Sequence, residues 1–128
     1  MSAITSSTFV LSVNDLDASA RFYSERLGFE ETLRVVGWSF LKRGACQLRL
    51  GHCPDAQPMA GCPDHSWFAY LHVDDAASLY AECVAHGVAI WHPLDDKPWG
   101  VREFAIVTPD GHRIVFGEAL GRASGEER

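Results

Sequence analysis

Apolar and polar positions alternate near the start of the chain, and the pattern then changes to a helical period. The alternation puts Phe9 and Val13 on one face of a strand predicted over residues 8–13. Further on, apolar side chains recur every three or four positions, which predicts an amphipathic helix over residues 17–27. Gly28 follows it, and glycine is the residue that most often ends a helix. The apolar strand face is therefore expected to pack under this helix.

Short strands interrupted by glycines follow the first helix. They are predicted at residues 31–36, 38–43 and 46–50. The first part of the chain therefore has the order βαβββ. Residues 52–66 contain three prolines and a glycine, a composition typical of a loop.

The same order of elements recurs in the second part of the chain. Asp15 stands opposite Asp75 in this comparison, and Gly28 stands opposite Gly87. The second part is predicted to comprise a strand at 67–73, a helix from Asp74 or Asp75 to His86, a strand at 88–91, a loop at 95–100, a strand at 102–107, a turn at 108–111 and a strand at 112–118. An internal duplication outweighs local propensity as evidence for the fold.

Length and composition favour one globular domain. The chain has 128 residues, of which 47% are hydrophobic, enough to form a core. We expect a single α+β domain over 1–128. Its expected parts are module one at 8–51, a connector at 52–66, module two at 67–118 and a polar tail at 119–128.

Charge and hydropathy exclude some partners. The 11 Lys and Arg against 17 Asp and Glu give a net charge of −6, whereas nucleic-acid binding needs a basic patch. The negative charge is compatible with a cationic small molecule, although solubility alone explains it. No apolar run approaches the roughly 18 residues of a membrane span. The first residues show no signal-peptide pattern, and the four cysteines fit free thiols, so we expect a cytoplasmic protein.

Two segments resemble the vicinal-oxygen-chelate superfamily, which includes glyoxalase I, extradiol dioxygenases, and fosfomycin- and bleomycin-resistance proteins. They are residues 13–29 (VNDLDASARFYSERLGF) and 108–116 (TPDGHRIVF). A third segment, 97–104 (KPWGVREF), is similar to the bleomycin-resistance branch. The resemblance covers the chain from about Phe9 to Glu118. It implies two βαβββ modules whose curved mixed sheets form a cup.

In the metalloenzymes of this superfamily, His, Gln and Glu ligands from four strands line the cup. The matching positions here are Thr8, Arg49, Phe68 and Val115, and Gln47 lies two residues from Arg49 on the same strand face. Phenylalanine and valine have no ligating atom, and a guanidinium repels a cation. The resemblance therefore implies a member with no metal and no other cofactor.

The same strand faces predict an aromatic pocket. Phe68, Tyr70 and His72 alternate with apolar positions expected under the second helix, and Trp38 and Phe40 share a face. The candidate ligand-binding residues are Trp38, Phe40, Arg49, Phe68, Tyr70, His72, Trp99 and Arg102. Aromatic side chains of this kind bind flat rings by stacking and cations through their ring faces. Each of them could instead be a packing residue, and Arg102 could simply pair with an acid.

The resemblance implies a binding protein that sequesters a bleomycin-like or other aromatic or cationic ligand, and that forms a homodimer with two equivalent clefts. No catalytic residue is assigned. Two alternatives stay open at this point: a lyase or dioxygenase with a divergent metal site that uses His72 and Glu118, and a dimer whose cup is filled by its own side chains. A zinc site in the connector, from His52, Cys53, Cys62 and His65, is a weaker possibility because its spacing is poor.

Overall fold

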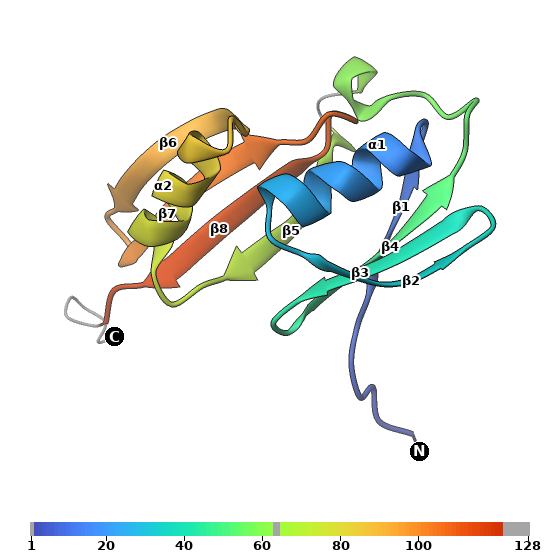
Figure 1. The fold of residues 1–128 in the computed structure, drawn as a ribbon. Helices are drawn as coiled ribbons and strands as arrows, with labels where there is room; N and C mark the ends of the chain where they lie inside the picture. Colours follow the sequence, from blue (N-terminus) through green and yellow to red (C-terminus); the bar gives the residue numbers. More distant parts are fainter. Residues whose placement is uncertain (1, 63–64, 122–128) are drawn as a thin grey trace.

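The computed structural model describes residues 2–62 and 65–121, and its strands form two separate sheets (Figure 1). In chain order the elements are β1 (Phe9–Val13), α1 (Leu16–Arg21), the π-helical turn η1 (Phe22–Arg26), β2 (Glu30–Val35), β3 (Trp38–Arg43), β4 (Cys46–His52), the 3₁₀ turn η2 (Met59–Gly61), β5 (Trp67–His72), α2 (Ala76–Ala85), β6 (Ala89–Lys97), β7 (Val101–Val107) and β8 (Arg113–Ala119).

Both sheets have the same topology. The first sheet has the order β1-β4-β3-β2 and the second β5-β8-β7-β6. In each, the first strand pairs in parallel with the last, and the other pairs are antiparallel. The expected α+β fold of two βαβββ modules is thus confirmed.

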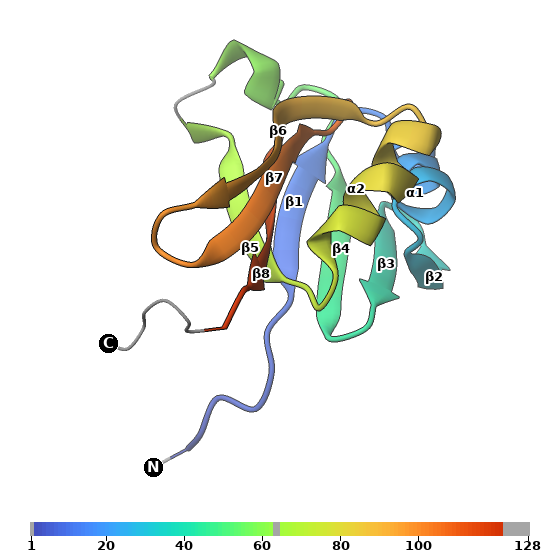
Figure 2. The same cartoon turned by 90° about the vertical axis from the view of Figure 1, so that its left-hand side faces the viewer.

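The helices cover one face of each sheet and enclose a single core. α1 packs on β3 and β4, and α2 packs on β6, β7 and β8. The two helices lie next to each other in both views (Figures 1 and 2). The core joins both modules, since Leu11, Tyr23 and Leu50 belong to the same cluster as Cys83 and Phe104. No helix in the described part of the chain is long and apolar enough to cross a membrane.

The first helix differs from the predicted one because its second half is a π-turn. In a π-turn each hydrogen bond spans five residues instead of four, so the helix is locally wider. Phe22 and Tyr23, which begin this turn, are both buried. Gly28 has φ 70°, and the amide of Phe29 donates to the Tyr23 carbonyl oxygen at 2.9 Å. The predicted glycine stop is therefore present, at the end of a helix that is locally wider than the sequence pattern suggested.

Irregularities in two of the predicted strands, β5 and β6, were not predicted. β6 continues to Lys97 through register shifts near His92 and Asp95, so the loop expected at 95–100 begins only after β6. β5 contains an extra residue between Trp67 and Ala69, which shifts its register with β8. The predicted polar tail lies largely outside the described residues, and so does part of the connector.

Polar contacts connect the two modules. The buried Ser19 hydroxyl on α1 donates to Asp110 in the turn before β8 at 2.5 Å. Arg43, at the end of β3, contacts both Glu82 on α2 and the carbonyl oxygen of Leu27. The Pro-Asp-Gly turn recognised in the sequence thus also fastens the second module to the first helix.

Candidate functional site

The face of the first sheet that α1 leaves uncovered carries apolar side chains around one arginine. Directly paired residues on neighbouring strands lie on the same face, and Arg49 on β4 pairs with Val10 on β1 and Phe40 on β3. We call this the open face of the first sheet. Its members by register include the apolar Val10, Leu33, Val35, Trp38 and Phe40, the charged Arg49 and Lys42, and the polar Ser12 and Gln47.

These neighbouring apolar side chains are partly or largely exposed to solvent, although together they form one apolar surface. Val10 is 59% exposed and Leu33 51%, while Trp38 and Phe40 are half-buried. Contiguous exposed apolar surface on a small domain is typical of a binding surface. Gly51 makes room for the Trp38 ring, because a Cβ at Gly51 would lie 2.9 Å from the ring.

Arg49 is held by rings rather than by acids. Its guanidinium carbon lies 4.2 Å from the ring centroid of Trp38 and 5.7 Å from that of Phe40. Its Nε is buried, and no described residue makes a hydrogen bond to it. The expected proximity of Trp38, Phe40 and Arg49 is thus present, and the three form one cluster.

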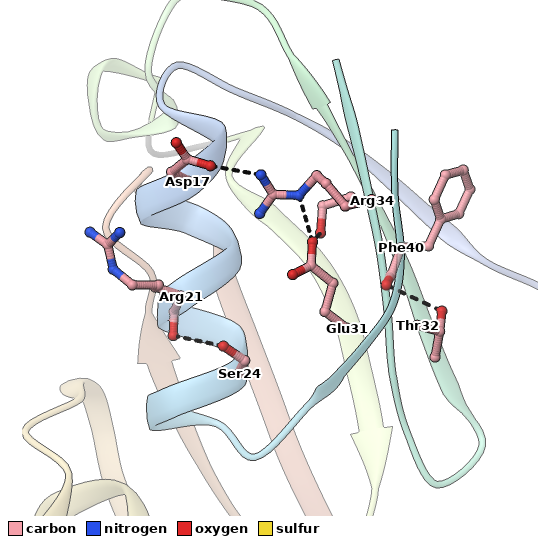
Figure 3. A network of polar contacts seen from close by, with 8 residues as sticks. Asp17, Arg21, Ser24, Glu31, Thr32, Arg34 and Phe40 are labelled. Atoms are coloured by element: carbon pink, nitrogen blue, oxygen red, sulfur yellow. Dashed lines mark hydrogen bonds and ion pairs between the residues drawn. The ribbon is translucent and has the colours of Figure 1, made fainter. Parts of the chain in front are cut away.

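An ion network on the other side of β2 and β3 fixes this part of the sheet (Figure 3). Arg34 bridges Asp17 on α1 and Glu31 on β2, at 2.6 Å to each. Glu31 also accepts from the buried Ser39 hydroxyl, and this hydrogen bond, together with Arg34, lowers the pKa of Glu31. The Phe40 ring points away from the network and from α1 in Figure 3, towards the open face.

The uncovered face of the second sheet is more polar. Its members by register are Trp67, Tyr70, His72, Glu103, Arg113 and Val115, and we call it the open face of the second sheet. Tyr70 lies over Gly117, where a Cβ would overlap the Tyr70 hydroxyl. That hydroxyl donates to Glu103 at 2.9 Å, and burial and this hydrogen bond raise the pKa of Tyr70 to about 12. Tyr70 is therefore a proton donor in this pair at neutral pH.

A second arginine is held between tryptophans on this sheet. The Arg113 guanidinium carbon lies 4.0 Å from the ring centroid of Trp91 and 4.9 Å from that of Trp67. The ligand-binding residues predicted from the sequence did not include Trp67, Trp91 or Arg113. The paired alternation of β5 and β8 could have indicated Arg113, but Trp91 lies in an irregular part of β6 that no alternation predicts.

Three of the predicted ligand-binding residues, Phe68, Arg102 and Trp99, lie outside the two open faces. The bulge in β5 lets the Phe68 ring pack edge-on against Phe9 and His112 instead of joining Tyr70. Arg102 forms a two-pronged ion pair with Asp96 on β6, and alternation places it on the α2 side of β7, opposite Glu103. Trp99 is 70% exposed at the β6–β7 turn, with no ring contact to a described residue.

A cleft of about 660 Å³ lies between the modules. It is bounded by Phe29 and the β3–β4 turn on one side and by the first turns of α2 on the other. Tyr70 and His72 line it as well, because β5 is an edge strand, but the other candidate residues do not. Two of the acidic groups that line it are engaged, since Asp75 caps α2 and Glu82 pairs with Arg43, whereas Asp74 is exposed.

The residues at the metal positions of the superfamily do not fit a divalent ion. Arg49 is positively charged and stacked on Trp38, and Phe68 is packed against other rings. Across residues 2–62 and 65–121, no three His, Cys, Asp or Glu side chains gather as a metal site would require, in the connector or elsewhere. Glu118 accepts a hydrogen bond from the Ala76 amide at the start of α2, on the opposite side of the sheet from His72.

Solved structures with the same fold include antibiotic-binding proteins. A bleomycin resistance determinant encoded on the transposon Tn5 is 32% identical, with a TM-score of 0.75 over 91% of this chain and 98% of the other. TnmS3, an antibiotic-binding protein from a Streptomyces species, is 25% identical, with a TM-score of 0.74 over 93% and 98%. The bleomycin-binding protein of Streptomyces verticillus, solved with copper(II)-bleomycin, is 24% identical, with a TM-score of 0.72 over 95% and 100%, and shows likeness of fold alone.

None of the curated proteins compared matches the chain. A family model described as the Glyoxalase/Bleomycin resistance protein/Dioxygenase superfamily matches residues 5–116, nearly the whole chain. Together with the duplicated βαβββ topology, this match shows that the chain belongs to that superfamily.

Proposed function

We propose that this protein binds an aromatic small molecule on its open faces and sequesters it without transforming it. A bleomycin-like compound is one candidate ligand, because proteins of similar fold are described as a bleomycin resistance determinant, a bleomycin-binding protein and an antibiotic-binding protein. The observation that carries the proposal is the exposed apolar face of the first sheet, with Trp38 and Phe40 beside Arg49.

We also propose that the protein is a homodimer in which the open face of the first sheet of one protomer faces the open face of the second sheet of its partner. Val10 and Leu33 on the first open face are exposed, whereas a bound small molecule is usually buried in a concave site. Twofold symmetry would give two equivalent clefts. The exposed Trp99 turn then belongs to the rim of each cleft.

Sequestration is favoured over catalysis by the side chains available. The positions that hold metal ligands in enzymes of this superfamily carry groups unsuited to a cation. His72 and Glu118, the pair that a divergent enzyme would use, point to opposite sides of the second sheet. No specific observation supports a lyase or a dioxygenase.

Isothermal titration calorimetry tests the proposal. Chelator-treated protein is titrated with metal-free bleomycin and with a panel of flat aromatic compounds, and the recovered ligand is checked by mass spectrometry. We expect binding of at least one compound, recovery of that compound unchanged, and about tenfold or more weaker binding by Phe40→Ala, since buried aromatic contacts dominate such sites.

Val84→Ala on α2 is the matched control, because Val84 is an exposed apolar residue outside both open faces. Its affinity should equal that of the wild type. Chemical conversion of a bound compound, or binding that Phe40→Ala leaves unchanged, would contradict the proposal.

A further inference from the structure

The charge at the open face of the first sheet bears on which ligands it accepts. A cationic ligand would be attracted to the ring faces of Trp38 and Phe40. However, the guanidinium of Arg49 already lies 4.2 Å from the Trp38 centroid and 5.7 Å from that of Phe40. A second cation at these rings would be repelled by the first.

The charge of Arg49 is not neutralised within the described chain. No described residue forms an ion pair or a hydrogen bond with it, although the chain has 17 acidic residues. By contrast, Arg34, Arg43 and Arg102 each pair with a carboxylate. The positive charge of Arg49 therefore remains available at the open face.

Contact with the Trp38 ring also restricts the guanidinium of Arg49. An arginine whose flat face lies on a ring keeps its N–H groups directed outwards in its plane, in a fork that matches a planar or tetrahedral anion. The Nε of Arg49 is itself buried, so the terminal N–H groups of the guanidinium are the donors that an acidic ligand at this face can reach.

We infer that the ligand of this face is an aromatic molecule carrying an acidic group, such as a sulfonate, carboxylate or phosphate, and that Arg49 binds the acidic group while the ligand ring packs on Phe40 and Leu33. This inference rests on the proposed function, which it narrows from aromatic ligands in general to anionic ones. The stacked Arg113 on the second sheet presents the same chemistry.

Two fluorescent probes that differ in one group test this inference. 1-Anilinonaphthalene-8-sulfonate has a sulfonate, and N-phenyl-1-naphthylamine has the same rings without it. We expect the wild-type protein to bind the sulfonate at least about tenfold more tightly than the neutral probe, as charge-assisted hydrogen bonds allow. Added sodium chloride should weaken sulfonate binding and leave binding of the neutral probe nearly unchanged.

Variants at Arg49 test whether this residue causes the preference for the sulfonate probe. Arg49→Met keeps a long apolar side chain and should lose the preference for the sulfonate, whereas Arg49→Lys keeps the charge without the planar fork and should retain part of it. Arg21→Met is the control, because Arg21 is an exposed arginine on α1, outside both open faces. Circular dichroism melting curves establish that each variant is folded.

The outcomes separate this inference from the proposed function. Equal affinity for both probes, or a preference that persists in Arg49→Met, overturns the inference and leaves the proposed function standing. Binding of neither probe, together with no binding in the calorimetric panel, contradicts the proposed function and the inference with it.

Discussion

At the scale of single residues, the open face of the first sheet depends on a glycine as much as on its aromatic side chains. Trp38 can lie along the sheet beside Arg49 only because Gly51 has no side chain. Gly117 gives Tyr70 the same room on the second sheet. Gly51 on β4 and Gly117 on β8 occupy corresponding positions in the two modules. Each of these glycines leaves room for one aromatic ring on its sheet.

Gly51→Ala should displace the Trp38 ring. The added Cβ would lie 2.9 Å from that ring, closer than carbon atoms tolerate, so the ring must move off Arg49. We expect a loss of about 1–3 kcal/mol in the free energy of unfolding, the usual cost of overpacking, together with weaker probe binding. Urea denaturation and probe titration measure the two effects. Val84→Ala on α2, outside both open faces, is the control, and equal behaviour of the two variants would show that Gly51 has no such role.

Protonation of His112 should destabilise the protein. Its ring is buried against Phe68, and burial lowers the pKa of the imidazole. The folded state therefore binds fewer protons than the unfolded state, so stability present above the unfolded pKa of about 6.5 is lost as the pH falls towards the lower folded pKa. Unfolding free energies measured in urea from pH 7.5 to pH 5 should fall more steeply for the wild type than for His112→Asn. Parallel pH profiles for the two proteins would refute this assignment.

At the scale of elements, each α-helix begins with an aspartate that accepts from its first turn. Asp15 accepts from the Ala18 amide and Asp75 from the Ser78 amide, both at 3.0 Å. The two helices thus begin with the same N-cap although their ends differ, since only the first widens into a π-turn.

Asp75→Ala should therefore destabilise the protein by about 1 kcal/mol, the usual cost of losing such a cap. Asp74→Ala is a closely matched control, because Asp74 is adjacent, exposed and equally charged, and its side chain makes no hydrogen bond within the described residues. It should change stability by less than about 0.5 kcal/mol. Thermal melting of both variants makes the comparison, and equal destabilisation would mean that the charge near α2 matters rather than the cap.

The sequence predicts these elements well where a period is regular and poorly where one residue is inserted. Alternation places Trp38, Phe40 and Arg49 on one face because β3 and β4 pair without a shift. Phe68 is misplaced because one extra residue in β5 reverses the side chain that follows. Trp91 is missed for the same reason in β6. Insertions of this kind depend on the partner strand, so one strand's own pattern does not reveal them.

At the scale of the whole molecule, the duplication produces one shared core and two open faces. The helices of both modules meet at this core, so neither sheet can cover its open face with them. The two faces have diverged, since the first is largely apolar around Arg49 whereas the second carries the Tyr70–Glu103 pair. A cleft built from both faces would have one apolar and one polar wall.

Dimer formation should bring these walls together. We expect light scattering coupled to size-exclusion chromatography to give twice the mass of one chain at micromolar concentration. Because exposed apolar surface drives association, Leu33→Asp should weaken the dimer or its ligand binding, whereas Val84→Asp on α2 should do neither. A wild-type protein that stays monomeric would contradict the composite cleft.

The central claim is that ligand binds at the open face of the first sheet, and nuclear magnetic resonance tests it most directly. In ¹H–¹⁵N spectra the indole signal of Trp38 is assigned with Trp38→Phe, and the tighter-binding fluorescent probe is then titrated. The account predicts shifts of the Trp38 indole and the Arg49 Nε–H signals, together with amides of β3 and β4. Shifts confined to the intermodule cleft around Ser78 and Leu79, with the Trp38 signal unmoved, would contradict it.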